Sequence, residues 1–217
     1  MSANFVNQLE DLQRRSLRMA SAVEDIFEEA VEAALNVDRN LAERVIQRDE
    51  EVDQEEVQIE SEVIRLIALF QPMGSDLRRL TTVLKVNNDL ERTADCAVNI
   101  AERARHLEPD AIRSAIPDLK QMSVLVRRIL RESLKAFAMS DLDLAKRVLR
   151  SDDTIDAFYG QFIRKIAEHQ IFGPNELSVA LDVLSIAKNF ERIADHCTNI
   201  AEDVIYFTTG QIVRHQD

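Results

Sequence analysis

The sequence LERTADCAVNIAE runs from Leu90 to Glu102, and the sequence FERIADHCTNIAE runs from Phe190 to Glu202. The two segments are identical at eight of thirteen positions and are offset by 100 residues. A match of this length at one fixed offset indicates an internal duplication. Most of the identical residues are polar, whereas an apolar core can be built from many combinations of side chains. The repeated Glu-x-x-x-Asp motif therefore indicates that the carboxylates themselves are used.

A second pair of acidic residues precedes each motif. Asp49 and Asp53 lie four residues apart, as do Asp152 and Asp156, and the two pairs are offset by 103 residues. Residues four apart share one face of a helix. Because the two offsets are nearly equal, the duplication covers both segments. Each half of the chain therefore places two acidic pairs on neighbouring helices.

Helix-breaking residues are sparse, with 4 Gly and 4 Pro in 217 residues, and this sparsity predicts long helices. The breakers and the helical periodicity of the apolar residues divide the chain into six helices. We expect them near residues 4–36, 39–70, 75–106, 117–139, 141–171 and 174–209. Gly210 is expected to end the last of them.

The predicted fold class is all-α, with two tandem antiparallel three-helix bundles related by the duplication. Short connections make successive helices antiparallel neighbours, and the repeat supplies a second copy of the first three. The first bundle is expected over residues 1–110 and the second over residues 111–217, with the boundary between Glu108 and Ile116.

The charge balance narrows the classes of function. The chain has 27 Lys and Arg residues against 39 Asp and Glu residues, a net charge of −12. An acidic protein is poorly suited to the phosphate backbone of nucleic acids and well suited to cations or basic surfaces. The sequence shows neither a signal peptide nor an apolar run of about 18 residues that would span a membrane. We therefore expect a cytoplasmic protein that reaches the inner membrane only through its partners.

The acidic pairs are candidate metal ligands. Four carboxylates packed together repel one another and resist the loss of hydration, so they need counter-cations. Arginine, lysine or metal ions can supply the positive charge, and oxygen-rich clusters suit Mg²⁺, Ca²⁺, Mn²⁺ or iron. We expect one metal site at Asp49, Asp53, Glu91 and Asp95, and another at Asp152, Asp156, Glu191 and Asp195. The alternative is a solvated acidic face with salt bridges within each helix.

Signatures of catalysis are absent from the sequence. No histidine follows a Glu by three residues, as the helices of ferritin-like di-iron oxidases require, and the chain has no P-loop, glycine-rich dinucleotide turn or Cys-x-x-Cys. Cys96, His196 and Cys197 adjoin the acidic motifs. We interpret them as packing residues, because the first copy has a cysteine where the second has a histidine. The sequence therefore predicts that the protein is not an enzyme.

These residues resemble the PhoU family of phosphate-transport accessory regulators. The resemblance rests on NDLERTAD followed by NIAE, from Asn88 to Glu102, and on FERIADH followed by NIAEDVIY, from Phe190 to Tyr206. QPM at residues 71–73, DLR at residues 76–78 and TG at residues 209–210 are also similar to the family. The resemblance covers nearly the whole chain.

The resemblance implies a tandem pair of three-helix bundles and a cytoplasmic negative regulator of phosphate uptake and phosphate-starvation signalling. In that family the paired acidic motifs can hold multinuclear iron or zinc clusters, and some members contain no metal. Iron or zinc is therefore the first expectation, with Mg²⁺, Mn²⁺ or Ca²⁺ as alternatives. The implied partners are the ATPase subunit of the phosphate ABC importer and a membrane sensor histidine kinase, and we also expect a homodimer.

Two other functions remain open. One is a metal-free helical scaffold whose carboxylates bind a basic partner, and partner binding that survives chelation would favour it. The other is a multi-metal hydrolase, which a pocket above the metals and measurable phosphatase activity would favour.

Overall fold

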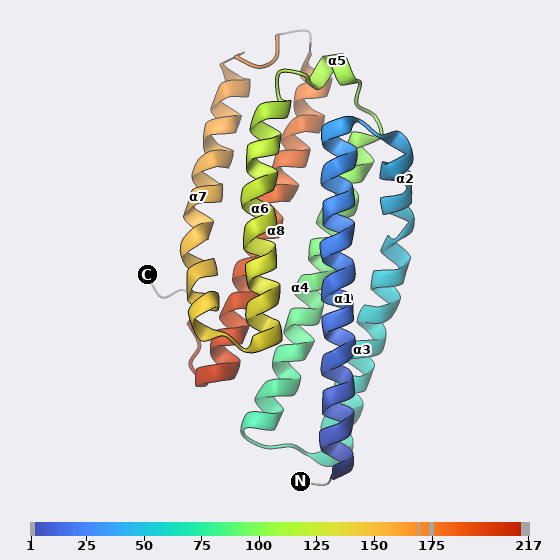
Figure 1. Ribbon diagram of the computed structural model, residues 1–217, viewed down its shortest axis with the longest axis vertical. Helices are drawn as coiled ribbons and strands as arrows, with labels where there is room; N and C mark the ends of the chain where they lie inside the picture. The colour runs from blue at the N-terminus through green and yellow to red at the C-terminus, as the bar shows by residue number, and fades with distance from the viewer. Residues whose placement is uncertain (1–2, 169, 174–175, 214–217) are drawn as a thin grey trace.

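The computed structural model describes residues 3–168, 170–173 and 176–213 (Figure 1). The helices are α1 (Ala3–Asn36), α2 (Arg39–Gln47), α3 (Asp49–Phe70), α4 (Ser75–Ala104), α5 (Pro109–Ile112), α6 (Ile116–Met139), α7 (Leu142–Ala167) and α8 (Leu177–Thr209). No strand occurs among the described residues, and the predicted all-α class is confirmed. In these same ranges no helix combines the length and the apolar character needed to cross a bilayer.

The helix predicted over residues 39–70 is two helices, α2 and α3, which meet at Arg48. The Arg48 N–H donates to Val45 O at 3.0 Å, and the Glu51 N–H donates to Arg48 O at 3.2 Å, so bonds over three residues interrupt the α-helical pattern. Neither Gly nor Pro marks this point in the sequence. The acidic run from Asp49 to Glu51 forms the first turn of α3, where negative charge interacts favourably with the helix dipole.

Smaller differences lie at the connections. The short helix α5 begins at Pro109 and is absent from the sequence-based prediction. The helix predicted to reach residue 171 ends at Ala167, and Phe172 beyond it packs into the core. The predicted start of the last helix at residues 174–175 lies outside the described residues. Gly210 follows the last residue of α8 with a φ of 75°, so the prediction that it ends this helix is confirmed.

The turn before the second helix of each half is built in the same way. Asp38 accepts hydrogen bonds from the N–H groups of Asn40 and Leu41, each at 3.0 Å. Asp141 accepts one from the N–H of Leu144 at 2.9 Å. A side-chain cap of this kind stabilises a helix start by about 1 kcal/mol. The two caps set where α2 and α7 begin.

All the long helices run along the length of the molecule, as Figure 1 shows. α4 and α8 lie side by side in the middle, with α1 and α6 in front of them in this view and α3 and α7 at the two edges. α1 packs on α3 and α4, and α6 packs on α7 and α8, so the two antiparallel three-helix bundles are confirmed. Yet α4 and α8 pack on each other more extensively than any other pair of helices, and the two bundles share one hydrophobic core.

Side chains from both halves meet in this shared core and at its edge. The rings of Phe27 on α1 and Phe190 on α8 pack edge to face, with centroids 6.1 Å apart. Lys85 Nζ on α4 lies 2.9 Å from the carboxylate of Asp203 on α8, which is buried. These contacts hold the acidic motifs of α4 and α8 in fixed positions relative to each other.

Candidate metal centre

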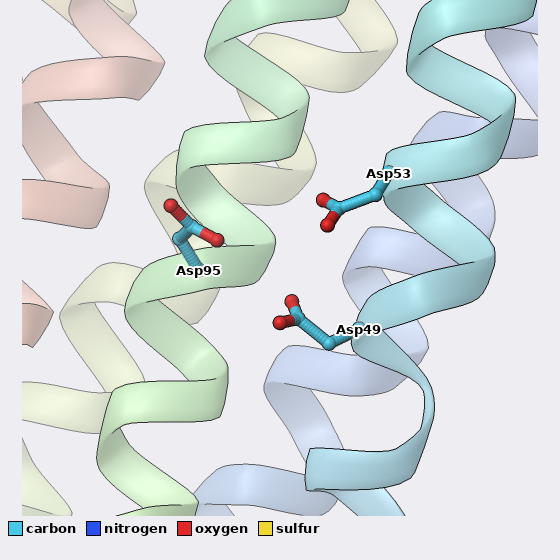
Figure 2. Close-up of side chains that lie close together, drawn as sticks. All are labelled: Asp49, Asp53 and Asp95. Atoms are coloured by element: carbon cyan, nitrogen blue, oxygen red, sulfur yellow. The ribbon is translucent and has the colours of Figure 1, made fainter.

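Three aspartates, which we call the first cluster, converge between α3 and α4. Asp49 and Asp53 project from α3 toward the side of α4 that carries Asp95 (Figure 2), and each of the three offers an oxygen within 4.8 Å of the others. The arrangement follows from the packing of α3 on α4, because residues four apart on one helix present the same face to its neighbour. The structure thus brings together three of the four residues predicted for the first site.

The first cluster has an acceptor that no group of the described residues satisfies. Asp49 Oδ1 is buried and has no hydrogen-bond partner among the described residues. Burial raises the pKa of Asp49, and the charges of Asp53, Asp95 and Glu102 raise it further. A raised pKa means that the folded protein disfavours the negative charge, which a bound proton or cation would offset. Converging carboxylates with an unsatisfied oxygen are the donors that hard cations prefer, so these residues fit a metal ion.

Positive charges near the first cluster relieve only part of the repulsion. Burial raises the pKa of Asp95, and the charge of Asp53 raises it further. The charges of Arg192, Arg92 and His196 lower this pKa but do not outweigh the first two effects. Arg192 and His196 belong to α8, so the second half of the chain contributes to the potential at the first cluster. No residue of the first cluster forms an ion pair within the described ranges.

Glu91, the fourth residue predicted for the first site, lies beside the cluster and is not one of its converging members. Burial raises the pKa of Glu91, the neighbouring Asp95 raises it next, and weaker contributions come from Asp53 and Glu56. Glu56 on α3 therefore belongs to the same acidic face, although the predicted ligand set omits it. The signal in the sequence was the helical spacing that continues from Asp53 to Glu56.

The second cluster consists of Asp156 on α7 with Glu191 and Asp195 on α8, whose oxygens also lie within 4.8 Å of one another. The side chain of Asp152, the remaining residue predicted for this site, lies outside the described part of the structure. Burial and the charge of Glu191 raise the pKa of both Asp156 and Asp195, while Lys188 lowers it. Lys188 Nζ donates directly to Glu191 Oε2, so the second cluster has a protein cation in contact with it.

Cys96, His196 and Cys197 belong to neither group of converging ligand atoms in the described ranges. Burial raises the pKa of Cys96 to about 11, so its thiol is neutral near pH 7, and Cys197 is also buried. His196 Nδ1 lies 2.9 Å from Asp89 Oδ1, and Asn199 Nδ2 donates to the same oxygen at 3.1 Å. These contacts join α4 to α8.

A cleft of about 750 Å³ opens between α3, α4 and α8 beside the first cluster. Glu56 and Glu60 line it from α3, Arg92 lines it from α4, and His196 and Glu202 line it from α8. Because Glu56 also belongs to the acidic face of the first cluster, the cleft borders that face.

The chain matches the family model of the PhoU domain twice, over residues 16–104 and 119–204. It is 38% identical over 209 residues to the phosphate-specific transport system accessory protein PhoU homolog of Aquifex aeolicus, covering 96% of this chain and 95% of that protein. The homolog of the same name from Pseudomonas aeruginosa is 36% identical, with 99% of this chain and 89% of that protein covered.

Solved structures show the same likeness. The crystal structure of PhoU from Pseudomonas aeruginosa matches with a TM-score of 0.91 at 34% identity, covering 95% of this chain and 100% of that chain. The phosphate transport system regulatory protein PhoU from Streptococcus pneumoniae matches with a TM-score of 0.89 at 28% identity, covering 96% and 99%. The resemblance found in the sequence is therefore confirmed. The chain belongs to the PhoU family, which is a family of regulatory accessory proteins and not of enzymes.

Proposed function

We propose that this protein is a cytoplasmic negative regulator of phosphate uptake and phosphate-starvation signalling whose two acidic clusters bind metal ions. The signalling role is supported by similarity to proteins named phosphate-specific transport system accessory proteins and to a structure named a phosphate transport system regulatory protein. The proposed partners are the ATPase subunit of the phosphate ABC importer and a sensor histidine kinase. The proposed assembly is a homodimer.

The observation that carries the metal proposal is that three carboxylates converge in each half of the chain. The repeat relates Asp53 to Asp156 and Asp95 to Asp195, so the two clusters share two of their three positions, and the third is Asp49 in the first cluster and Glu191 in the second. Carboxylates this close oppose folding unless cations neutralise them. The family resemblance makes iron or zinc the proposed occupant, and Mg²⁺, Mn²⁺ or Ca²⁺, which carboxylate oxygens also suit, are the alternatives.

Each cluster takes its residues from two helices, so its occupancy affects how those helices pack. A bound cation supplies positive charge between the carboxylates. In the first cluster, the carboxylates of α3 and α4 are then attracted to the cation between them instead of repelling one another. The same holds for the carboxylates of α7 and α8 in the second cluster. We propose that metal thereby fixes the faces that α3 and α7 present to partner proteins.

The signalling role is tested by deleting the gene and measuring a phosphate-starvation reporter in phosphate-rich medium. Deletion should raise reporter expression, and the wild-type gene should restore repression. An Asp49→Asn/Asp95→Asn variant should fail to restore it, whereas Asp25→Asn, at an exposed position on α1, should succeed. Unchanged expression after deletion would refute the signalling role. Full repression by the double variant would show that signalling does not need the first cluster.

The partner proposal is tested by co-purification. The importer ATPase subunit and the cytoplasmic region of the kinase should each be retained by the purified protein. Retention should weaken after chelation and recover when metal is added back. Retention of neither partner would contradict the proposal, and equal retention with and without chelator would favour the metal-free scaffold.

A further inference from the structure

The second cluster has a lysine ammonium group in direct contact with one of its carboxylates. Lys188 on α8 donates to Glu191 Oε2, and its Nζ lies 5.6 Å from the centre of the Tyr159 ring on α7. The repeat places Asn88 at the position of Lys188 and Glu56 at the position of Tyr159. The first half of the chain therefore has neither the ammonium group nor the ring that contacts it at the corresponding positions.

The Lys188 ammonium is held between two groups. The side chain of Glu191 is only 14% exposed, so its interaction with the ammonium is partly shielded from water. An aromatic ring attracts a cation that lies within about 6 Å of its centre, and Tyr159 meets that condition. Partial burial lowers the pKa of Lys188, but the hydrogen bond to Glu191 and the nearby negative charges raise it more, so the group stays charged.

The acidic face of the first cluster carries a further carboxylate, Glu56, which acts on Glu91. Burial and the charges of Asp53, Asp95 and Glu102 raise the pKa of Asp49. Glu56 on α3 adds a carboxylate at the position that the repeat matches to Tyr159. Arg92 and Arg192 act on the first cluster through their charge but form no ion pair with it within the described residues.

We propose that Lys188 is a built-in counter-cation of the second cluster, so that the first cluster binds metal more tightly and fills first. The inference rests on the proposed metal function. A metal ion that binds Glu191 must displace the Lys188 ammonium from this carboxylate or share the carboxylate with it, and both reduce the net attraction. Where metal is scarce, the second cluster stays assembled around Lys188 while the first cluster is left unneutralised.

The test is a calorimetric titration of Zn²⁺ into untagged protein that has been treated with chelator. Wild-type protein should show two classes of binding, and Asp49→Asn/Asp95→Asn should remove the tighter one. Lys188→Asn, which copies the residue of the first half into the second, should tighten the weaker class by roughly tenfold. Lys146→Asn removes the same charge from an exposed position on α7 and should change either class by about twofold or less.

Tyrosine fluorescence gives a second readout, because the chain has no Trp and 2 Tyr. The ring of Tyr159 contacts the ammonium that metal must displace, so the change in emission should follow the weaker class of sites. The reverse substitution Asn88→Lys, at an exposed position, should weaken the tighter class. It keeps the inference testable should Lys188→Asn fail to fold.

The outcomes separate this inference from the metal function itself. The role of Lys188 would be overturned if the two clusters of the wild-type protein bound Zn²⁺ with equal affinity. It would also be overturned if Lys188→Asn left the weaker class unchanged and Asn88→Lys left the tighter class unchanged. Either result would leave metal binding in place. A failure of Zn²⁺ to bind at either cluster would overturn both. Two classes that move in the predicted directions would support the assignment.

Discussion

Replacing Asp95 with Asn should stabilise the metal-free protein. Oxygens of the first cluster lie within 4.8 Å of one another. Two unit charges at that separation repel by about 0.9 kcal/mol in bulk water and by about 3.5 kcal/mol at an effective dielectric constant of 20. Because Asp53 is exposed and Asp49 and Asp95 are half-buried, the lower part of this range applies. The substitution removes two such repulsions, so we expect the free energy of unfolding to rise by about 2 kcal/mol.

The assay is urea unfolding at pH 7 in the presence of a chelator, followed by the helical circular dichroism signal. Asn has nearly the same size as Asp, so packing is preserved. Asp25→Asn, an exposed aspartate on α1, serves as the matched control and should stay within about 0.5 kcal/mol of wild type. With saturating metal the order should reverse, because the variant lacks a ligand. If Asp95→Asn is no more stable than wild type in chelator, the reasoning fails, because Arg92 and Arg192 would then already neutralise the cluster.

The same variant predicts a pH dependence. Burial and the charge of Asp53 raise the pKa of Asp95 in the folded state, so wild-type protein loses stability as pH rises from the unfolded pKa of about 3.9 through the raised folded pKa. In urea titrations at a series of pH values in chelator, the extra stability of Asp95→Asn should therefore be small at acid pH and full at neutral pH. A difference that stays constant with pH would contradict this origin. Phe27→Ala removes a buried ring that packs on Phe190 across the two halves and should lower the free energy of unfolding by about 3 to 5 kcal/mol. Since the halves share one core, calorimetry should show a single unfolding transition for the wild-type protein and for Phe27→Ala. Two separate transitions would show that the halves unfold independently.

Much of the fold could be predicted because the repeat shows the same helical pattern twice. The apolar residues of the first predicted helix recur with a helical period, and Phe5, Val23 and Ala30, which belong to this series, are buried. The break at Arg48 could not be predicted, because its backbone stays close to helical, with φ −83° and ψ −9°, and no Gly or Pro marks it. Hydrogen bonds that span three residues instead of four at this point leave the apolar period intact.

The candidate site could be predicted as a set of shared faces but not as a set of contacts. Helical spacing places Glu91 and Asp95 on one face of α4. Which of them reaches the aspartates of α3 depends on the rotation of one helix against the other and on side-chain rotamers, which spacing does not specify. Lys188 likewise falls on the acidic face of α8 by its spacing, yet its pairing with Glu191 depends on the rotamers of both side chains.

Both acidic clusters are expected to bind metal. The most direct measurement is elemental analysis of untagged protein purified without chelator, beside the Asp49→Asn/Asp95→Asn variant purified in the same way. Wild-type protein should contain iron or zinc in at least stoichiometric amount, and the variant should lose the share of the first cluster while it retains that of the second. A wild-type protein free of bound metal, or a variant whose metal content equals that of the wild type, would contradict the account.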